Sequence, residues 1–479
     1  MNYRMTAYLF GVLLTIESAL LLIPTVVSAI YGESVLPFLY TVLIVVAVAI
    51  PLVLLKPKNT RIGAKEGFSV SALAWIFMSA FGALPFVFSG AIPHYVDALF
   101  ETVSGFTTTG ASILTEVESL PKGILFWRSF THWVGGMGVL MLMLAIMPMN
   151  TRSIHLMRAE TPGPSKGKLV PRMKDTAKIL YLIYMVLTAI QFVALLCTGM
   201  PVYDSLVNSF ATAGTGGFSV LNNSIAGYNN PAAEWVIGIF MILFGVNFNM
   251  FYLILIKRAK EVFRNEELRT YLLIVLVGTG VIVANICHTY ASLSDSIRES
   301  FFHVASVVST SGFAVSDYNQ WPMLSKMVLL FVMFTGACAG STAGGFKISR
   351  VILLLKNARR EIKHLLHPKS VNVVRMDKEP VAEETIKASN NYMTFYLLFF
   401  IVSLLLVAVD GFSFEDTFTG VLTCFNNVGP GLGMVGPAGN FSEFSIWSKL
   451  ILSADMLLGR LEIFPLLIVF SPSTWTKNR

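Results

Sequence analysis

Four short segments of the chain end in a glycine at a fixed distance from an acidic residue, and the residues just before that glycine are mostly threonine, serine, glycine or asparagine. In each segment the acid precedes a glycine by 13 positions, with an apolar stretch and a short polar strip between them. Glycine allows backbone conformations that aim carbonyl oxygens at a narrow axis without an intervening side chain. Rings of backbone carbonyls can replace the water around a dehydrated cation. The acid and glycine pairs are Asp97 and Gly110, Asp204 and Gly217, Glu299 and Gly312, and Asp416 and Gly429.

The residues just before each glycine are expected to add carbonyl oxygens to the same site. A single strip of this kind is typical of an ordinary turn, but four strips with one spacing favour a shared site. The acids are expected at helix N-caps or in first turns, where a carboxylate is favourable against the helix dipole. The candidate cation-binding residues are Thr108, Thr109 and Gly110; Thr215, Gly216 and Gly217; Thr310, Ser311 and Gly312; and Asn427, Val428 and Gly429.

The elements that must position these strips are helices too short to cross a bilayer. Each apolar stretch predicts a half-helix that enters the membrane and turns back, because a full span needs about 20 residues. Non-helical backbone at membrane depth is tolerated only when it is buried in protein or lines a watery cavity. We therefore expect the four loops, 97–111, 204–218, 299–313 and 416–430, to converge on a common axis.

The composition places these loops in a membrane protein. Of 479 residues, 54% are hydrophobic and only 13% are charged, whereas soluble domains are about one quarter charged. Long continuous apolar runs predict spanning helices rather than the short alternating strands of a barrel. The first apolar run is too long for a signal peptide. The predicted fold class is an all-α polytopic membrane protein.

Lysine and arginine cluster in alternate connections, as the positive-inside rule requires of cytoplasmic loops. No Lys or Arg occurs between Thr198 and Trp235, for example, whereas the connection from Arg350 to Lys387 is strongly basic. The excess of positive charge therefore indicates topology, and nucleic-acid binding is not expected. Both termini are predicted to be cytoplasmic in a multi-pass membrane protein. The acids concentrate on the external side, where they would attract a cation.

Ten spans follow from this pattern: two N-terminal helices and four helix–pore-loop–helix repeats around a central pore. The spans are expected near 6–30, 36–55, 68–92, 124–148, 178–200, 233–257, 270–290, 324–350, 391–411 and 446–470. The predicted divisions are 1–60 for the two extra helices, 61–150 for repeat 1, 151–260 for repeat 2, 261–365 for repeat 3 and 366–479 for repeat 4.

One span is interrupted by glycines, which predicts a mobile gate. Each glycine costs a helix about 1 kcal/mol relative to alanine, so a break within residues 334–347, hereafter the gate loop, is expected below the four strips. Close helix packing through small residues is the alternative. The candidate gate residues are Gly336, Gly340, Ser341, Thr342, Gly344 and Gly345.

Arg460 lies in the last span, where an arginine costs at least about 3 kcal/mol unless it is paired or wetted. We expect it below the strips as an electrostatic barrier to cations, oriented by Glu462. A structural ion pair with Asp455 or Glu462 is the alternative. The segment from Trp133 to Gly138 predicts close helix contact, and His132 is expected to be a hydrogen-bonded polar group rather than a metal ligand. No transition-metal site, cofactor motif or catalytic constellation is present, so no enzyme is expected.

The four strips, the fourfold repeat and the glycine-rich gate loop resemble the Trk/Ktr/HKT potassium transporter superfamily. The two extra N-terminal helices resemble its bacterial TrkH/TrkG branch most. The resemblance implies one filter glycine per repeat, potassium as the transported ion, a homodimer in the lipid bilayer, and a cytoplasmic nucleotide-binding TrkA-type ring that controls opening. The fourth strip departs from the symmetric filter of tetrameric channels at Asn427, Val428 and Pro430, which predicts looser selectivity, with sodium or rubidium admitted.

Three functions could account for these patterns to different degrees. A gated, channel-like potassium pathway explains four like-oriented pore loops. An ion-coupled secondary transporter, linked to Na⁺ or H⁺, would also use broken helices but is expected to build them from inverted repeats. A non-conducting scaffold leaves the repeated strips unexplained. The sequence favours the first function.

Overall fold

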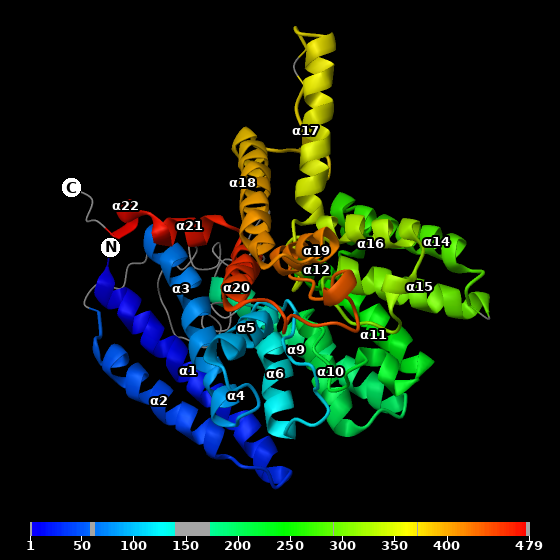
Figure 1. Ribbon diagram of the computed structural model, residues 1–479. Helices are drawn as coiled ribbons and strands as arrows, with labels where there is room; N and C mark the ends of the chain where they lie inside the picture. The colour runs from blue at the N-terminus through cyan, green and yellow to red at the C-terminus, as the bar shows by residue number, and fades with distance from the viewer. Residues whose placement is uncertain (1, 58–62, 139–172, 291, 371, 476–479) are drawn as a thin grey trace.

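The computed structural model describes residues 2–57, 63–138, 173–290, 292–370 and 372–475. Helices form almost all of its regular structure, and the strands among the described residues are one two-stranded antiparallel hairpin, β1 (Arg375–Met376) with β2 (Glu379–Pro380). The predicted all-α class is therefore confirmed, with this small hairpin as an addition (Figure 1).

The two N-terminal helices form an antiparallel pair along one side of the molecule (Figure 1). They are α1 (Tyr3–Ile30) and α2 (Leu36–Leu54). Gly11 lets the two helices approach closely, because a Cβ at Gly11 would lie 2.7 Å from the Val53 nitrogen. Both helices leave apolar side chains exposed along their length, as lipid contact requires.

Each of the four repeats contains a long first helix and a half-helix. The first helices are apolar and, taking α3 with α4, 21 residues or longer, which suits a bilayer span. They are α3 (Ala64–Gly82) continued by α4 (Leu84–Phe88), α9 (Met173–Cys197), α14 (Glu266–Ile286) and α18 (Glu383–Val407). The half-helices are α5 (Tyr95–Phe106), α10 (Val202–Gly214), α15 (Leu293–Val308) and α19 (Phe414–Asn426).

The second helix of each repeat does not run as the continuous span that the sequence predicted. In repeat 2, α11 (Pro231–Phe244) and α12 (Phe248–Leu255) meet at a bend of 90°. Gly245 ends α11, and the Asn247 side chain caps α12 by accepting from the Asn249 N–H. The expected span 233–257 is therefore wrong as a single helix, because a glycine and an asparagine cap interrupt the apolar run.

The other second helices are also interrupted. In repeat 3 the gate loop separates α16 (Met323–Thr335) from α17 (Ile348–Leu366), as predicted. In repeat 4, Glu462 and Ile463 adopt positive φ values of 62° and 56° between α20 (Ile446–Leu461) and α21 (Phe464–Phe470). In repeat 1, α6 (Lys122–Gly136) ends at Gly136 with Met137 as its C-cap, and residues 139–148 of the predicted span lie outside the described residues. Six described helices, or seven with the bent pair, are long and apolar enough to cross a membrane.

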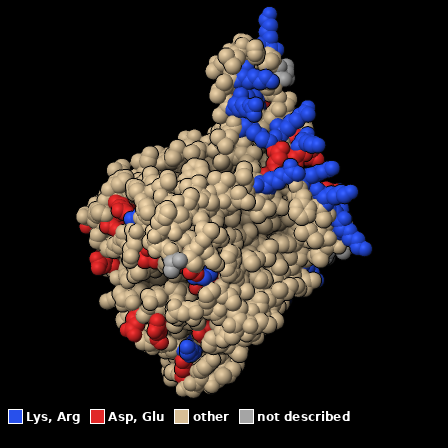
Figure 2. Space-filling model, turned by 90° about the vertical axis from the view of Figure 1, so that its right-hand side faces the viewer, with Lys and Arg blue, Asp and Glu red and all other residues tan. Residues whose placement is uncertain are grey.

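Basic side chains gather at one end of the molecule. Figure 2 shows Lys and Arg on the protruding segment, which is α17 in Figure 1, and on the adjoining surface, where a few Asp and Glu lie among them; the other Asp and Glu on this face lie toward the other end. The start of α1 joins α22 (Pro472–Trp475) through a hydrogen bond from the Tyr3 hydroxyl to the Trp475 carbonyl. The remaining short elements are α13 (Ala259–Val262), η1 (Ser224–Tyr228), η2 (Tyr318–Gln320), η3 (Ala408–Asp410) and η4 (Gly433–Val435).

Candidate functional site

Three of the four predicted acids lie in the first turn of a half-helix. Asp97, Asp204 and Asp416 occupy the third position of α5, α10 and α19. Glu299 does not, because α15 begins at Leu293, after the Ser292 cap, so that Glu299 is its seventh residue and Asp295 is its first-turn acid. The expectation for Glu299 was therefore wrong, although the distance from Glu299 to its glycine matches the other repeats.

All four half-helices end in the same backbone motif. The residue two before each glycine adopts the left-handed conformation, with φ of 56° at Thr108, 58° at Thr215, 57° at Thr310 and 54° at Asn427. Its N–H donates to the carbonyl three residues earlier, as from Thr108 to Gly105. The N–H of the following residue donates to the carbonyl five residues before that residue, as from Thr109 to Ser104. This pair of bonds is the Schellman motif. A left-handed threonine costs about 1–2 kcal/mol, so the surrounding contacts must hold three such residues.

The four glycines form a closed ring, hereafter the glycine ring. A Cβ added to Gly110 would lie 1.9 Å from the Gly216 carbonyl oxygen, and one added to Gly217 would lie 1.9 Å from that of Ser311. One on Gly312 would lie 2.2 Å from the Val428 oxygen, and one on Gly429 would lie 2.6 Å from the Thr109 oxygen. Each repeat thus contacts the next, and the fourth contacts the first. The predicted convergence of the loops is confirmed.

Several side chains in and beside the strips bind one another. The Asn427 amide donates to Thr109 Oγ1 at 2.9 Å, which joins the fourth strip to the first. Thr109 Oγ1 also lies 2.8 Å from Thr107 Oγ1, and the matching pair in repeat 3, Ser309 and Ser311, has the same separation. These bonds fix the strips and leave carbonyl oxygens around the ring.

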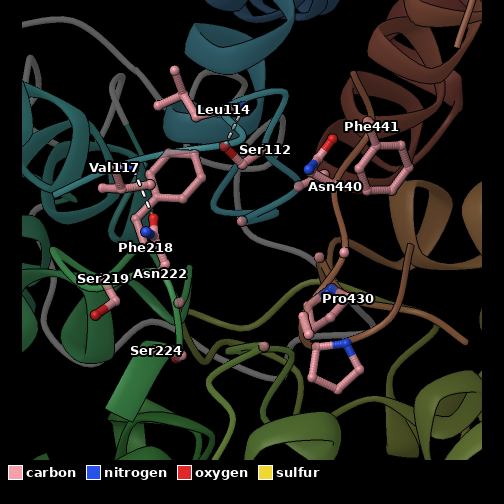
Figure 3. Close-up of a pocket in the computed structure, with 18 of the residues that line it drawn as sticks. Ser112, Leu114, Val117, Phe218, Ser219, Asn222, Ser224, Pro430, Asn440 and Phe441 are labelled. Carbon is pink, nitrogen blue, oxygen red and sulfur yellow. Dashed lines mark hydrogen bonds between the residues drawn. The ribbon is translucent and has the colours of Figure 1, made fainter. Parts of the chain in front are cut away.

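A cavity of about 160 Å³ lies on one face of the glycine ring. All four glycines border it, together with the return segments that follow them: 111–117, 218–224 and 430–441 (Figure 3). Hydrogen bonds join these segments across repeats, from the Val117 N–H to Asn222 Oδ1 at 2.7 Å and from the Phe441 N–H to the Ser112 carbonyl at 2.8 Å. The return segments of repeats 1, 2 and 4 therefore enclose a space on this face of the ring, hereafter described as above the ring.

The gate loop packs against the residues that precede the glycines, on the opposite face of the ring. The Gly344 N–H donates to Thr310 Oγ1 at 2.8 Å, and a Cβ on Gly344 would lie 2.6 Å from that of Asn427. The loop is non-helical from Gly336 to Lys347 and almost fully buried. Gly336, Gly340 and Gly345 have φ of 62°, 72° and 76°, whereas Ser341 and Thr342 are buried between them. The loop therefore occupies the space below the ring.

Arg460 ties the gate loop to the first repeat. Its guanidinium donates to the Thr342 carbonyl at 2.6 Å and to the Gly135 and Gly136 carbonyls at 2.7 Å each. Among the described residues, Glu462 pairs with Arg350 at 2.6 Å and Asp455 accepts from Ser403 at 2.6 Å. Neither the expected orientation by Glu462 nor the alternative ion pair is found, since backbone carbonyls bind the arginine instead.

A second clamp on the gate loop was not predicted from the sequence. The buried Glu267 carboxylate on α14 accepts from the Ala339 N–H at 2.6 Å and from the Ser349 N–H at 3.2 Å. It therefore holds the loop near its start and at the beginning of α17. Residues 267, 339 and 349 are too far apart in sequence for any local pattern to join them, although a carboxylate in an apolar span is itself a signal.

The remaining predictions near the ring concern α6. The expected close packing at Trp133–Gly138 is confirmed, since a Cβ on Gly135 would lie 1.8 Å from the Phe106 carbonyl. His132 donates to the Gly105 carbonyl at 2.7 Å and accepts from the Phe218 N–H at 3.4 Å. It is thus a hydrogen-bonded group, as expected. The described residues contain no cluster of three His, Cys, Asp or Glu suited to a metal ion.

Comparison with known proteins places this geometry in a family. The family model TrkH, described as cation transport protein, matches residues 37–477. The Trk system potassium uptake protein TrkH of Escherichia coli strain K12 is 38% identical over 485 residues, covering 99% of this chain and 100% of that protein. TrkG of the same strain is 33% identical, covering 99% of each chain.

A solved structure is also similar over the whole chain. It is the crystal structure of the potassium transporter TrkH from Vibrio parahaemolyticus, with a TM-score of 0.89, 31% identity, and coverage of 99% of this chain and 100% of that one. The family model describes transport proteins, so the expectation that the chain is not an enzyme is confirmed. The resemblance seen in the strips therefore extends to the whole sequence and fold, and this chain belongs to the TrkH family of cation transport proteins.

Proposed function

We propose that this chain is the potassium-translocating membrane subunit of a Trk-type uptake system, and that the glycine ring is its selectivity filter. The observation that carries the proposal is the closed ring of four left-handed turns, in which each glycine lies against a carbonyl of the next repeat. Such a ring can replace the water of a dehydrated cation at little reorganisation cost. The names of the relatives, which are potassium uptake proteins, support potassium as that cation.

The ring supplies its oxygens from the backbone of the twelve predicted residues. Thr109, Gly216, Ser311 and Val428 lie directly before the glycines, and their carbonyls border the neighbouring repeats. The C-terminal ends of the four half-helices also converge here and add partial negative charge. The fourth strip differs in its side chains but keeps the same backbone, with Asn427 in the left-handed conformation that threonine adopts elsewhere.

We further propose that the gate loop closes this pathway in the present conformation. It fills the space below the ring, and Arg460 adds a fixed positive charge there. A cation leaving the filter would meet both. Opening then requires the loop to leave its contacts with Thr310, Arg460 and Glu267.

The cytoplasmic partner is proposed to bind the basic end of the molecule. Helix α17 protrudes there, with α18 beside its lower part (Figure 1), and the gate loop leads directly into α17. A TrkA-type ring that moved α17 would therefore pull on the gate loop. This proposal includes a homodimer in the bacterial inner membrane, with both termini on the cytoplasmic side; the contact between Tyr3 and Trp475 supports a shared side for the two ends.

The experiment is ion flux into liposomes that hold the purified protein, measured with ⁸⁶Rb⁺ and with K⁺, with and without a TrkA-type ring and its nucleotides. We expect flux driven by the cation gradient alone, increased by the partner. No flux under any partner condition would contradict the proposal. Flux that requires a Na⁺ or H⁺ gradient would instead support the ion-coupled transporter.

A further inference from the structure

One ion pair is fully buried directly behind the first two filter loops. Glu101 on α5 and Arg128 on α6 lie 2.6 Å apart, with side chains 0% and 4% exposed. Continuum and mutational studies of other proteins show that well-packed apolar residues often stabilise a fold as much as a buried ion pair does. Stability alone therefore gives little reason for charges at this position.

The Glu101 carboxylate holds the return segment of repeat 1 with both oxygens. Oε1 accepts from Arg128 Nε at 2.6 Å and from the Ser112 hydroxyl at 2.9 Å. Oε2 accepts from the Ile113 N–H at 2.9 Å and from the same hydroxyl at 3.1 Å. Ser112 and Ile113 follow Gly110 by only two and three residues, so this carboxylate fixes the backbone that leaves the filter.

The Arg128 guanidinium holds the return segment of repeat 2 in a similar way. Its NH1 donates to the Ser219 carbonyl at 3.1 Å, and its carbon lies 3.5 Å from the centre of the Phe218 ring. Phe218 and Ser219 directly follow Gly217. Arg128 also borders the cavity above the ring, where Figure 3 shows Ser112, Phe218 and Ser219. One ion pair therefore sets the spacing between the outer ends of two filter loops.

The other repeats have no charge at this position. Four residues after the acid of each loop, repeat 1 has Glu101, whereas the others have Asn208, His303 and Gly420. His303 contacts the Ser316 carbonyl of its own return segment at 3.1 Å, and Asn208 donates to the Tyr228 hydroxyl at 3.1 Å. Among the described residues, hydrogen bonds also join the return segments of other repeats, but an ion pair at this position joins only those of repeats 1 and 2.

We propose that the Glu101–Arg128 pair is a specificity-determining bracket, which holds the outer ends of filter loops 1 and 2 at the spacing that favours K⁺ over Na⁺. The inference rests on the proposed filter. Both residues act through the backbone that they hold, so they are positioning residues. A ring with altered or more mobile spacing would discriminate less well against the smaller, more strongly hydrated Na⁺. The K⁺/Na⁺ flux ratio should therefore fall.

The test is the K⁺/Na⁺ flux ratio of Glu101→Gln in liposomes, beside the wild type. We expect the ratio to fall about fivefold or more, the factor that the loss of one net hydrogen bond produces. Arg128→Lys keeps the charge but not the planar fork, so its ratio should fall as well. Glu101→Gln combined with Arg128→Gln restores neutrality; the total flux should recover relative to Glu101→Gln alone, whereas the ratio should stay low. A wild-type ratio in Arg128→Lys or in the double variant would overturn the bracket.

Two further variants keep the proposal falsifiable if a charge variant fails to fold. Ser112→Ala removes a hydroxyl that binds Glu101 and Leu114, and it should lower the ratio in the same direction by a smaller factor. Glu234→Gln is the matched control. It breaks an ion pair with Arg298 in which the two atoms lie 2.7 Å apart and the side chains of Glu234 and Arg298 are 9% and 17% exposed. This pair lies away from the ring, so the K⁺/Na⁺ flux ratio should stay unchanged. An equal fall in Glu234→Gln would contradict the proposal. Absent wild-type flux would contradict the proposed function instead, whereas wild-type selectivity in every variant would contradict only the bracket.

Discussion

The four repeats are alike in the half-helices and strips that form the glycine ring, but they differ in the second helices on the gate-loop side of the ring. The half-helices and strips of all four repeats share one backbone, from the left-handed residue to the glycine, despite different side chains. The second helices below them share only the fact that they are interrupted: a 90° bend in repeat 2, the buried gate loop of Gly336 to Lys347 in repeat 3, and a two-residue break in repeat 4.

This difference separates two physical tasks. A dehydrated cation needs oxygens on every side, so each repeat must supply the same backbone geometry. Control of passage needs one movable obstacle, and a single repeat can supply it. The asymmetric gate loop is clamped by partners from three other places: Thr310 above, Arg460 from repeat 4 and Glu267 from α14. Changes to the ring should therefore alter which ion passes, whereas changes to the clamps should alter how much passes.

The largest expected effect is from Gly312→Ser. Its Cβ would lie 2.2 Å from the Val428 oxygen and 2.7 Å from Pro430 Cδ, so the ring must open. We expect the K⁺/Na⁺ flux ratio to fall by at least about tenfold, which corresponds to about 1.4 kcal/mol. Gly411→Ser is the matched control, because Gly411 has the same φ of 76° with no atom within 4 Å of the added Cβ. Unchanged selectivity in Gly312→Ser would remove Gly312 from the filter.

Arg460→Ala should increase flux without a comparable change in selectivity. It removes the positive charge below the ring and the bonds to Thr342, Gly135 and Gly136. We expect K⁺ flux in the absence of the partner to rise about tenfold, the factor for one hydrogen bond to a charged group. Arg258→Ala, at an exposed pair with Glu261, is the control. Lower flux in well-folded Arg460→Ala protein would refute the barrier.

Glu267→Gln should have the smallest effect of the three. The amide keeps one acceptor oxygen for the Ala339 or Ser349 N–H but loses the charge, so the clamp weakens rather than disappears. We expect K⁺ flux to rise about threefold, since a neutral hydrogen bond is weaker than a charged one. Glu266→Gln, at the neighbouring half-exposed residue paired with Lys356, should change nothing. A changed K⁺/Na⁺ flux ratio in Glu267→Gln would contradict the claim that the clamps on the gate loop control only how much ion passes.

The ring was predictable from sequence because its requirements are local. A positive φ at Gly110, Gly217, Gly312 and Gly429 favours glycine, and the same spacing recurs four times. The gate loop was predictable for a related reason, since its glycines and hydroxyls disfavour a helix. The capping residue Ser292, three residues before Asp295, likewise gave a local signal that α15 starts before Glu299.

The clamps and the bracket depend on tertiary contacts that no local pattern contains. Arg460 was found as an unusual charge, but its partners are backbone carbonyls of Thr342 and Gly135, which any residue offers. The bend between α11 and α12 was missed because Gly245 and Asn247 lie in an otherwise continuous apolar run. The charge pattern makes Glu101 one of several acids expected on the external side, whereas its role follows from the contact with Arg128, 27 residues away.

The most direct test is anomalous diffraction from crystals of this protein grown with Tl⁺ in place of K⁺. The glycine ring predicts an anomalous peak enclosed by the carbonyls of Thr109, Gly216, Ser311 and Val428, and loss of that peak in Gly312→Ser. A transport-competent protein with no peak at the ring, or with its only peak elsewhere, would contradict the claim that four backbone turns hold the ion.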